Sequence, residues 1–107
     1  MKTTTQLISD REVKRVHGNA NFGATSPRLV LNVAAVNAFR GYHNGSTARA
    51  ILLEHKLFYG VRDGKRSYDA HIAGPGPLKV TAKGRKYVAA VLREADHTDL
   101  MKAIGSA

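Results

Sequence analysis

The chain has 107 residues, 43% of them hydrophobic, and it contains neither cysteine nor tryptophan. A chain of this size folds around one core, so we expect a single domain over residues 1–107 with a mostly aliphatic interior. The lack of cysteine excludes disulfides, thiolate nucleophiles and cysteine-ligated metal sites. No apolar run approaches the roughly 18 residues of a membrane span, and no signal-peptide pattern opens the chain. We therefore expect a soluble, cytoplasmic protein with no membrane partner.

The charge balance of the chain is strongly basic. Seventeen Lys and Arg residues against eight Asp and Glu leave a formal net charge of +9. A positive field of this strength attracts polyanions, although a general surface charge that keeps the protein in solution is an alternative. The positions of the charges along the chain have to distinguish the two.

The first predicted helix covers residues 9–17. Ser9 and Glu12 have the spacing of a capping box, in which each side chain satisfies the other residue's backbone N–H, and a glycine follows as a stop. Residues 18–25 are rich in Gly and Asn and form a predicted loop, from which Phe22 is expected to reach the core.

A second helix is predicted to follow, and it should be the central one. Ser26 is a suitable N-cap and Pro27 suits the first helical position, where its missing N–H is not needed. The apolar residues that follow cover so much of the helix circumference that burial on several sides is expected. A short turn then leads to a third helix, residues 47–57, capped by Ser46 or Thr47. Two helices joined in this way are compatible with a helix-turn-helix.

A β-hairpin is predicted at residues 58–72. Aromatic and β-branched residues flank Asp63-Gly64, a dipeptide that favours a tight two-residue turn. Tyr59 and Tyr68 would face each other across this hairpin.

The last predicted elements are a short strand at 78–80 and a helix that begins at Thr81, its expected N-cap, and runs to about residue 95. The whole order of helices and strands indicates a small, mainly helical α+β domain. Its core would lie in residues 26–95, and residues 96–107 would form a short tail.

This order, together with the phrases "LKVTAKGRKYV" and "STARAILLEHKLF", resembles winged helix-turn-helix proteins over roughly residues 26–95. In that family a β-hairpin wing leads through a Leu-Thr-x-x-Gly-Arg-like phrase into the next helix. The phrase also has a physical reason of its own, because it supplies a strand, a cap and a small residue that permits close approach in the first helical turn. The resemblance implies a winged helix-turn-helix fold with a small β-hairpin wing.

The resemblance also implies a DNA-binding site in which helix 47–57 enters the major groove and the basic wing 62–66 contacts the backbone. Arg49 would read guanine, and Thr47 would meet a phosphate or a base edge. The implied site residues are Ser46, Thr47, Arg49, Ala50, Leu53 and Lys56 on the outward face of the helix, Arg62, Lys65 and Arg66 in the wing, and Lys83, Arg85 and Lys86 behind it.

Basic residues are concentrated where this site would lie. The segment from Lys56 to Tyr87 alone has a net charge of +6. Cations in the first turn of a helix oppose its dipole, so Lys83 and Arg85 predict a DNA phosphate near the start of the last helix, close to its free N–H groups. Clustered charge and element order together favour nucleic acid over a solvated basic surface.

Catalysis and metal binding have little support in the sequence. There is no nucleophile or phosphate-loop motif, and the five histidines show no metal-ligand spacing, so we expect neither an enzyme nor a cofactor. His55 lies on the apolar stripe of its helix and is expected to be a packed residue at the edge of the core.

The favoured interpretation is a double-stranded-DNA-binding regulator of transcription, of a size compatible with a phage or mobile-element product. The alternative is a winged-helix protein-interaction module, an inhibitor or adaptor that docks on an acidic surface of a polymerase, nuclease or similar machine. Leu53, if exposed, favours a protein partner. Apolar residues in the last helix and tail suggest either a homodimer through the C-terminal helix or packing of that helix back onto the first one.

Overall fold

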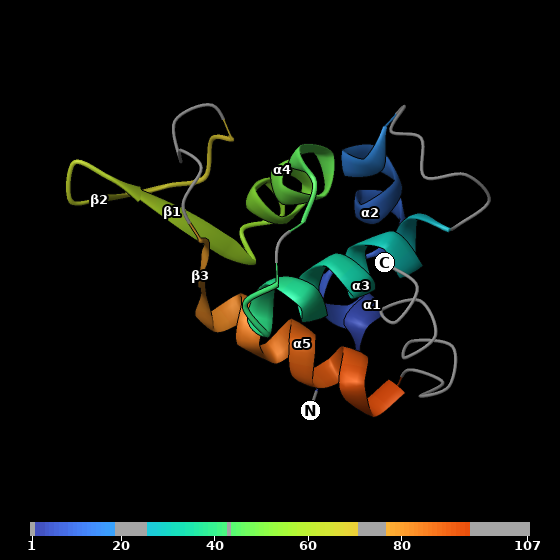
Figure 1. Cartoon of the computed structure of the whole chain (residues 1–107). Helices are drawn as coiled ribbons and strands as arrows, with labels where there is room; N and C mark the ends of the chain where they lie inside the picture. Colours follow the sequence, from blue (N-terminus) through green and yellow to red (C-terminus); the bar gives the residue numbers. More distant parts are fainter. Residues whose placement is uncertain (1, 19–25, 43, 71–76, 95–107) are drawn as a thin grey trace.

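The computed structural model describes residues 2–18, 26–42, 44–70 and 77–94. Five helices and a small three-stranded antiparallel sheet make up this part of the chain, so the predicted α+β class is confirmed (Figure 1). The helices are α1 (Thr4–Leu7), α2 (Asp10–His17), α3 (Pro27–Phe39), α4 (Ser46–Glu54) and α5 (Ala82–Glu94). The strands are β1 (Phe58–Arg62), β2 (Lys65–Ser67) and β3 (Lys79–Val80).

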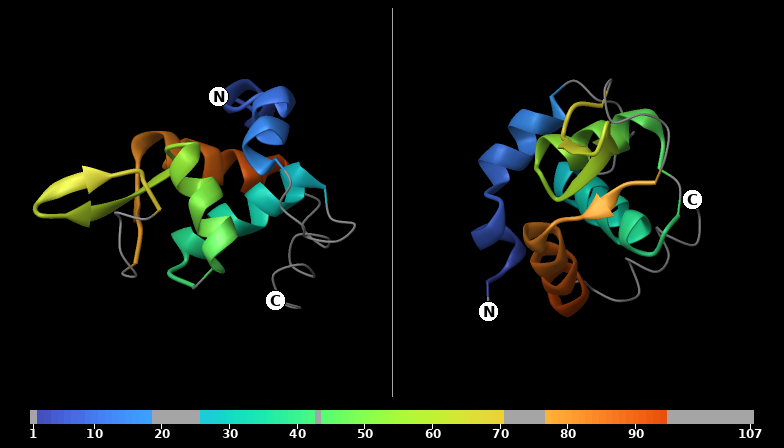
Figure 2. Two further views of the ribbon diagram at one scale, coloured as in Figure 1. Left: turned by 90° about the horizontal axis from the view of Figure 1, so that it is seen from above. Right: turned by 90° about the vertical axis from the view of Figure 1, so that its left-hand side faces the viewer.

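Helix α3 is the central element, as predicted, and it lies between α4 and α5 (Figures 1 and 2). The Ser26 hydroxyl accepts the N–H of Leu29 at 3.2 Å, and Pro27 is the first helical residue. The helix ends where Gly41 adopts a φ of 83° and its N–H donates to the carbonyl of Ala38. Both ends of the central helix are therefore set by local signals that the sequence contains.

Helix α2 begins where it was predicted, because the Ser9 hydroxyl accepts the N–H of Glu12 at 3.2 Å. Only this half of the predicted capping box is observed, since the Glu12 carboxylate accepts from Arg15 instead. Helix α1 was not predicted. A capping box between Thr3 and Gln6 starts it, and the carboxylate of Glu94 in α5 binds it by accepting from both the N–H (2.8 Å) and the hydroxyl (3.1 Å) of Thr4. A four-residue helix is too short to be stable alone, so this contact, 90 residues away in sequence, is what holds it.

A partly buried polar network fastens the N-terminal helices to the core. The guanidinium of Arg28 in α3 donates to the carboxylate of Asp10 (2.6 Å), to the carbonyl of Ile8 (2.7 Å) and to the hydroxyl of Tyr87 (3.1 Å). Tyr87, fully buried on α5, in turn donates to Asn32 at 2.6 Å. One α3 side chain thus ties α2 and its N-terminal flank to α5.

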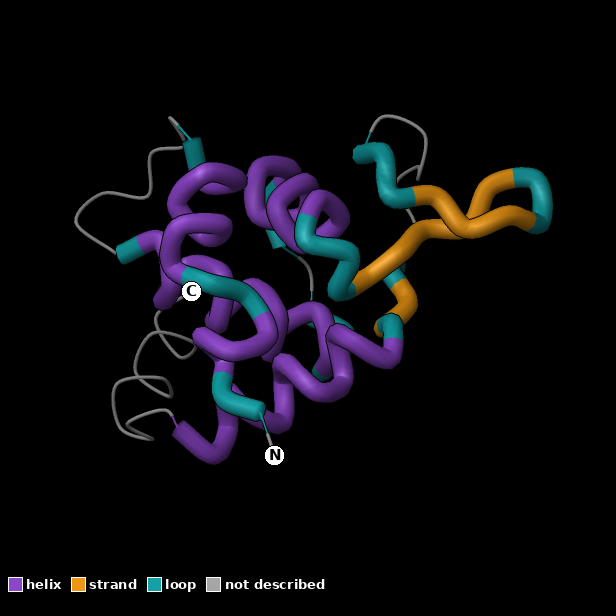
Figure 3. Tube along the Cα trace, turned by 180° about the vertical axis from the view of Figure 1, so that it is seen from behind, coloured by secondary structure: helices purple, strands orange, loops and turns teal. Residues whose placement is uncertain are grey.

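The sheet has the order β2-β1-β3, and β1 and β2 form the predicted hairpin. Asp63 and Gly64 both have positive φ angles, 53° and 76°, as a type I′ turn requires. The hairpin extends away from the helices (Figures 2 and 3), whereas β3 pairs with the other edge of β1 beside the core.

The junction between β3 and α5 packs directly on the chain that leaves α4. The hydroxyl of Thr81 lies 2.8 Å and 3.0 Å from the carbonyl oxygens of Lys56 and Leu57 and accepts the N–H of Gly84 at 2.9 Å. A Cβ atom at Gly84 would lie 2.0 Å from the carbonyl oxygen of Leu57. The predicted cap and the predicted close approach of a small residue are both confirmed.

Two predictions lie outside the described residues: the position of Phe22 and the tail at 96–107. Helix α5 packs against α3 and α1 rather than against α2, the helix that the sequence predicted as the first. Val88 and Val91 are buried in this packing, but Leu92 remains 52% exposed. The homodimer through the C-terminal helix stays a prediction.

Candidate nucleic-acid interface

The cations of the hairpin are divided between its two faces. Successive side chains of a strand point to opposite sides, and the register pairs Val61 with Arg66 and Arg62 with Lys65. Arg62 and Lys65 therefore share one face next to the turn, and Arg66 lies on the other. All three are exposed, so the wing has positive charge on both sides.

The face that carries Arg66 is a cluster of aromatic rings and cations. The rings of Tyr59 and Tyr68 lie 6.5 Å apart, which confirms their predicted pairing across the hairpin. The guanidinium carbon of Arg66 lies 4.3 Å from the centre of the Tyr59 ring, and the ammonium of Lys56 lies 5.8 Å from that of Tyr68. Cation–π contacts of this kind restrict long side chains without using their hydrogen-bond donors. The sequence pattern gave no sign of these cation–π contacts.

Lys56 occupies an unusual backbone position. Its φ of 59° lies in the left-handed region, and its N–H donates to the carbonyl of Leu53 while that of Leu57 donates to Leu52. This is the helix ending in which glycine is the ordinary residue, and a lysine there costs about 1 kcal/mol. The conformation places the Lys56 ammonium beside the hairpin rather than on α4.

Two predictions about α4 are wrong. The first concerns its start: Gly45 is the N-cap and no side chain caps the helix, so Ser46 is the first helical residue rather than a cap. The second concerns Leu53, which is fully buried instead of facing outward. The expected stripe through Arg49, Leu53 and Lys56 does not exist, because the helix ends at Glu54 and because α2, α3 and β1 all pack against this short helix.

The open face of α4 looks onto α2 across a hollow of about 330 Å³. Thr47, Ala50 and Glu54 line it from α4, and Arg15, Val16 and His17 contribute from α2. Ser46 is exposed nearby, whereas Arg49 is half-buried. Glu54 was not among the predicted site residues, although its spacing of four from Ala50 places it on the same helix face. A carboxylate here can accept a hydrogen bond from the amino group of cytosine and repels phosphate.

The three cations at the start of α5 do not form one surface. Lys83 lies toward α2 and the end of α4, where its charge acts on Glu12 and His55. Arg85 is exposed and lines neither the hollow beside α4 nor the separate hollow near α1 that Lys86 lines. The N–H of Gly84 already donates to Thr81, so this donor is not available to a phosphate.

His55 is packed at the end of α4, as predicted, and is only 4% exposed. Within the described part of the chain its Nε2 atom has no hydrogen-bond partner. Burial, together with the positive charge of Lys83, lowers the pKa of His55 to about 4. The residue is therefore neutral in the folded protein at neutral pH.

Among the described residues no group of three or more His, Asp or Glu side chains is placed to hold a metal ion. In those same residues, no helix combines the length and the apolar character needed to cross a bilayer.

Comparison with known proteins finds no matching family model, no similar curated protein and no similar solved structure. The relation to winged helix-turn-helix proteins stays a prediction.

Proposed function

We propose that the protein is a double-stranded-DNA-binding regulator of transcription that contacts DNA through the β1–β2 hairpin and the open face of α4. The observation that carries the proposal is the hairpin itself, which extends from the helical body with Arg62, Lys65 and Arg66 exposed around its turn. This activity would place the protein in the cytoplasm, on the nucleoid when bound.

The arrangement of the wing suits a phosphate backbone. Arg62 and Lys65 are direct neighbours across the two strands and present two charges on one face. Arg66, restrained over Tyr59, presents a third charge on the other face. Each phosphate that such a cation neutralises releases condensed counterions, which is a large, sequence-independent source of affinity. We therefore assign the wing the role of positioning the protein on the duplex.

Helix α4 is the proposed element that reads the DNA sequence, but the residues proposed to contact DNA differ from those predicted from the sequence. Leu53 is removed from the interface because it is buried. Thr47 and Glu54 on the open face are the proposed contacts to base edges or phosphate, and Lys56 joins the wing. The carboxylate of Glu54 repels the DNA phosphates, so binding by the wing must offset this repulsion. Cytosine is the base that Glu54 fits best, because its amino group can donate a hydrogen bond to the carboxylate.

The proposal is tested by fluorescence anisotropy with a random-sequence duplex and with polyglutamate, each at several salt concentrations. The variant Arg62→Ala/Lys65→Ala should reduce the slope of log affinity against log salt by about 2, because two phosphate contacts are lost. The control Arg11→Ala/Lys14→Ala removes the same charge from exposed positions of α2 and should change the slope much less. Equal losses in both variants would contradict a localised interface.

A second candidate is docking on an acidic surface of a partner protein. The exposed side chain of Val61, 48% accessible on the aromatic face of the wing, favours it together with Glu54 on α4. Apolar and acidic groups within a basic surface suit a protein partner better than a uniform phosphate backbone. In the same titrations this candidate predicts weak duplex binding without a steep salt dependence.

A further inference from the structure

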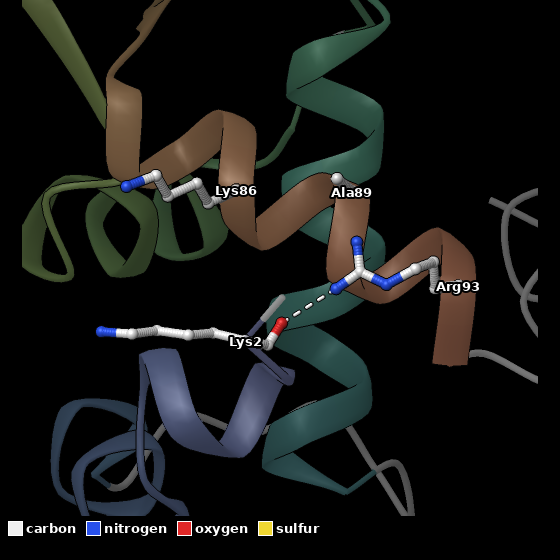
Figure 4. Close-up of a pocket in the computed structure, with 4 residues that line it drawn as sticks. All are labelled: Lys2, Lys86, Ala89 and Arg93. Atoms are coloured by element: carbon white, nitrogen blue, oxygen red, sulfur yellow. Dashed lines mark hydrogen bonds between the residues drawn. The ribbon is translucent and has the colours of Figure 1, made fainter.

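A second basic site lies on the side of the molecule away from α4. It is a hollow of about 340 Å³ lined by Lys2, Lys86, Ala89 and Arg93, between the chain that precedes α1 and the exposed face of α5 (Figure 4). Helix α3 separates α5 from α4, so this hollow is distinct from the open face of the proposed reading helix (Figure 1).

The hollow is built by the spacing of residues on α5. Lys86, Ala89 and Arg93 are three and four residues apart and therefore share one helix face. Ala89 has only a methyl group, which leaves space between the two longer side chains. Figure 4 shows the side chains of Lys2 and Lys86 extending in the same direction on either side of this space.

Hydrogen bonds hold the two walls together. The guanidinium of Arg93 donates to the carbonyl of Lys2 at 2.9 Å (Figure 4). Two residues after Lys2, Thr4 donates to the carboxylate of Glu94 through its N–H and its hydroxyl. The site is therefore held on both sides of the helix end, although Lys2 and Arg93 are 91 residues apart in sequence. Such a preformed site lowers the ordering cost of binding a ligand.

The electrostatics of the hollow favour an anion. Among the described residues neither Lys2, Lys86 nor Arg93 forms a salt bridge. The neighbouring carboxylate of Glu94 has both oxygens engaged by Thr4, at 2.8 Å and 3.1 Å. Three cationic side chains line this one hollow, and the positive potential that they create there attracts an anion.

We propose that this hollow binds a phosphate group, carried by a small ligand of up to about nucleotide size. The planar guanidinium of Arg93 keeps donors free for two oxygens of one phosphate, and two ammonium groups supply further charge. The volume lies at the lower end of the range for small-molecule pockets, about 300 to 1,000 Å³. Ala89 and the lysine stems provide an apolar surface for the rest of the ligand. The site does not depend on the wing or on the proposed DNA binding.

The proposal is tested by isothermal titration of the whole chain with inorganic phosphate and with AMP at constant ionic strength, chloride being the reference anion. Lys86→Gln removes one cation from the hollow, and Ala89→Leu fills it without a change in charge. Both should weaken AMP binding roughly tenfold. Arg85→Gln removes the same charge from a neighbouring position outside the hollow and should leave binding unchanged. A thermal unfolding curve for each variant checks that the fold is kept.

A phosphate of nucleic acid is the other source of the same group, and a further arm distinguishes it. Duplex binding is measured in the Arg62→Ala/Lys65→Ala background with and without Lys86→Gln. Loss of duplex binding on the second change, with no saturable AMP binding, assigns the site to a backbone phosphate. Saturable AMP binding that Lys86→Gln weakens assigns it to a free nucleotide. If neither phosphate nor AMP binds saturably and Lys86→Gln leaves duplex binding unchanged, the proposal is overturned; an equal loss in Arg85→Gln also overturns it. Failure of the wing variants alone would affect only the DNA-binding function.

Discussion

The wing hairpin and the start of α5 each contain three cations in the sequence, yet these cations are arranged very differently. In the hairpin, a two-residue turn and a fixed register keep Arg62, Lys65 and Arg66 within one small exposed projection. In α5, Lys83 lies near Glu12 and His55, Lys86 lines the hollow beside Lys2, and Arg85 is exposed outside that hollow, so the three cations have different neighbours. A cluster of charges in a sequence therefore predicts a surface only where the backbone keeps the side chains together.

The two regions also differ in what their small and polar residues do. In the wing, Asp63 and Gly64 only turn the chain, and charge can dominate. At the start of α5, Thr81 and Gly84 are required for contact with the backbone that leaves α4. The family-like phrase "VTAKGR" is thus explained by packing, and its cations are not needed for that role.

The largest effect is expected at this packed junction. Gly84→Ala places a Cβ atom 2.0 Å from the carbonyl oxygen of Leu57, a backbone atom that cannot move without shifting the chain. We expect the free energy of unfolding in urea to fall by about 3 kcal/mol. Gly45→Ser, at a glycine with open space around it, should be neutral or slightly stabilising. Equal stability of the two variants would contradict the close approach.

The second prediction concerns the pH dependence of stability, and it distinguishes the effect of Lys83 on His55 from that of a wing cation. His55 is neutral in the fold because its pKa is lowered to about 4, whereas in an unfolded chain it titrates near 6.5. Its contribution to stability is complete above pH 6.5 and is lost as the pH falls from there toward 4. The loss should reach about 2 kcal/mol, allowing for partial solvent screening.

Urea titrations at several pH values measure this loss, and NMR measures the pKa of His55 directly. Because the charge of Lys83 helps to lower that pKa, Lys83→Gln should raise it. Arg62→Gln, in the wing, should leave it unchanged. A pKa near 6.5 in the wild-type protein would contradict the buried position of His55.

The third prediction uses the strained backbone of Lys56 to separate stability from binding. Lys56→Gly relieves the left-handed conformation and should stabilise the fold by about 0.5 to 1 kcal/mol. The same change removes the cation beside Tyr68 and should weaken duplex binding by roughly threefold. Urea unfolding and anisotropy are measured on one preparation. Higher stability with unchanged affinity would exclude Lys56 from the interface.

The smallest effect is expected for the aromatic support of the wing. Tyr59→Leu keeps an apolar side chain on the same face but removes the ring under Arg66. A loss of about 0.5 kcal/mol in duplex binding is expected, because Arg66 becomes less ordered without losing its charge. Tyr42→Leu removes the ring under Arg40, outside the wing, and serves as the control. Equal effects of both would show that stacking does not contribute.

The amino-acid sequence by itself determined the elements whose signals are local. Ser9, Ser26 and Thr81 cap helices within three residues of themselves, and Asp63-Gly64 defines a turn whose register brings Tyr59 and Tyr68 together. These interactions join residues that are close in sequence or linked by a tight turn, so patterning is sufficient to find them.

Only the tertiary structure decided which residues share a surface. Leu53 was predicted on the outward face of its helix but is buried, because α2, α3 and β1 all pack against this helix of only nine residues. Helix α1 depends on Glu94, and the hollow at Lys86 depends on Lys2, contacts that span the length of the chain. Burial and charge clustering are set by such distant partners, and local periodicity has no information about them.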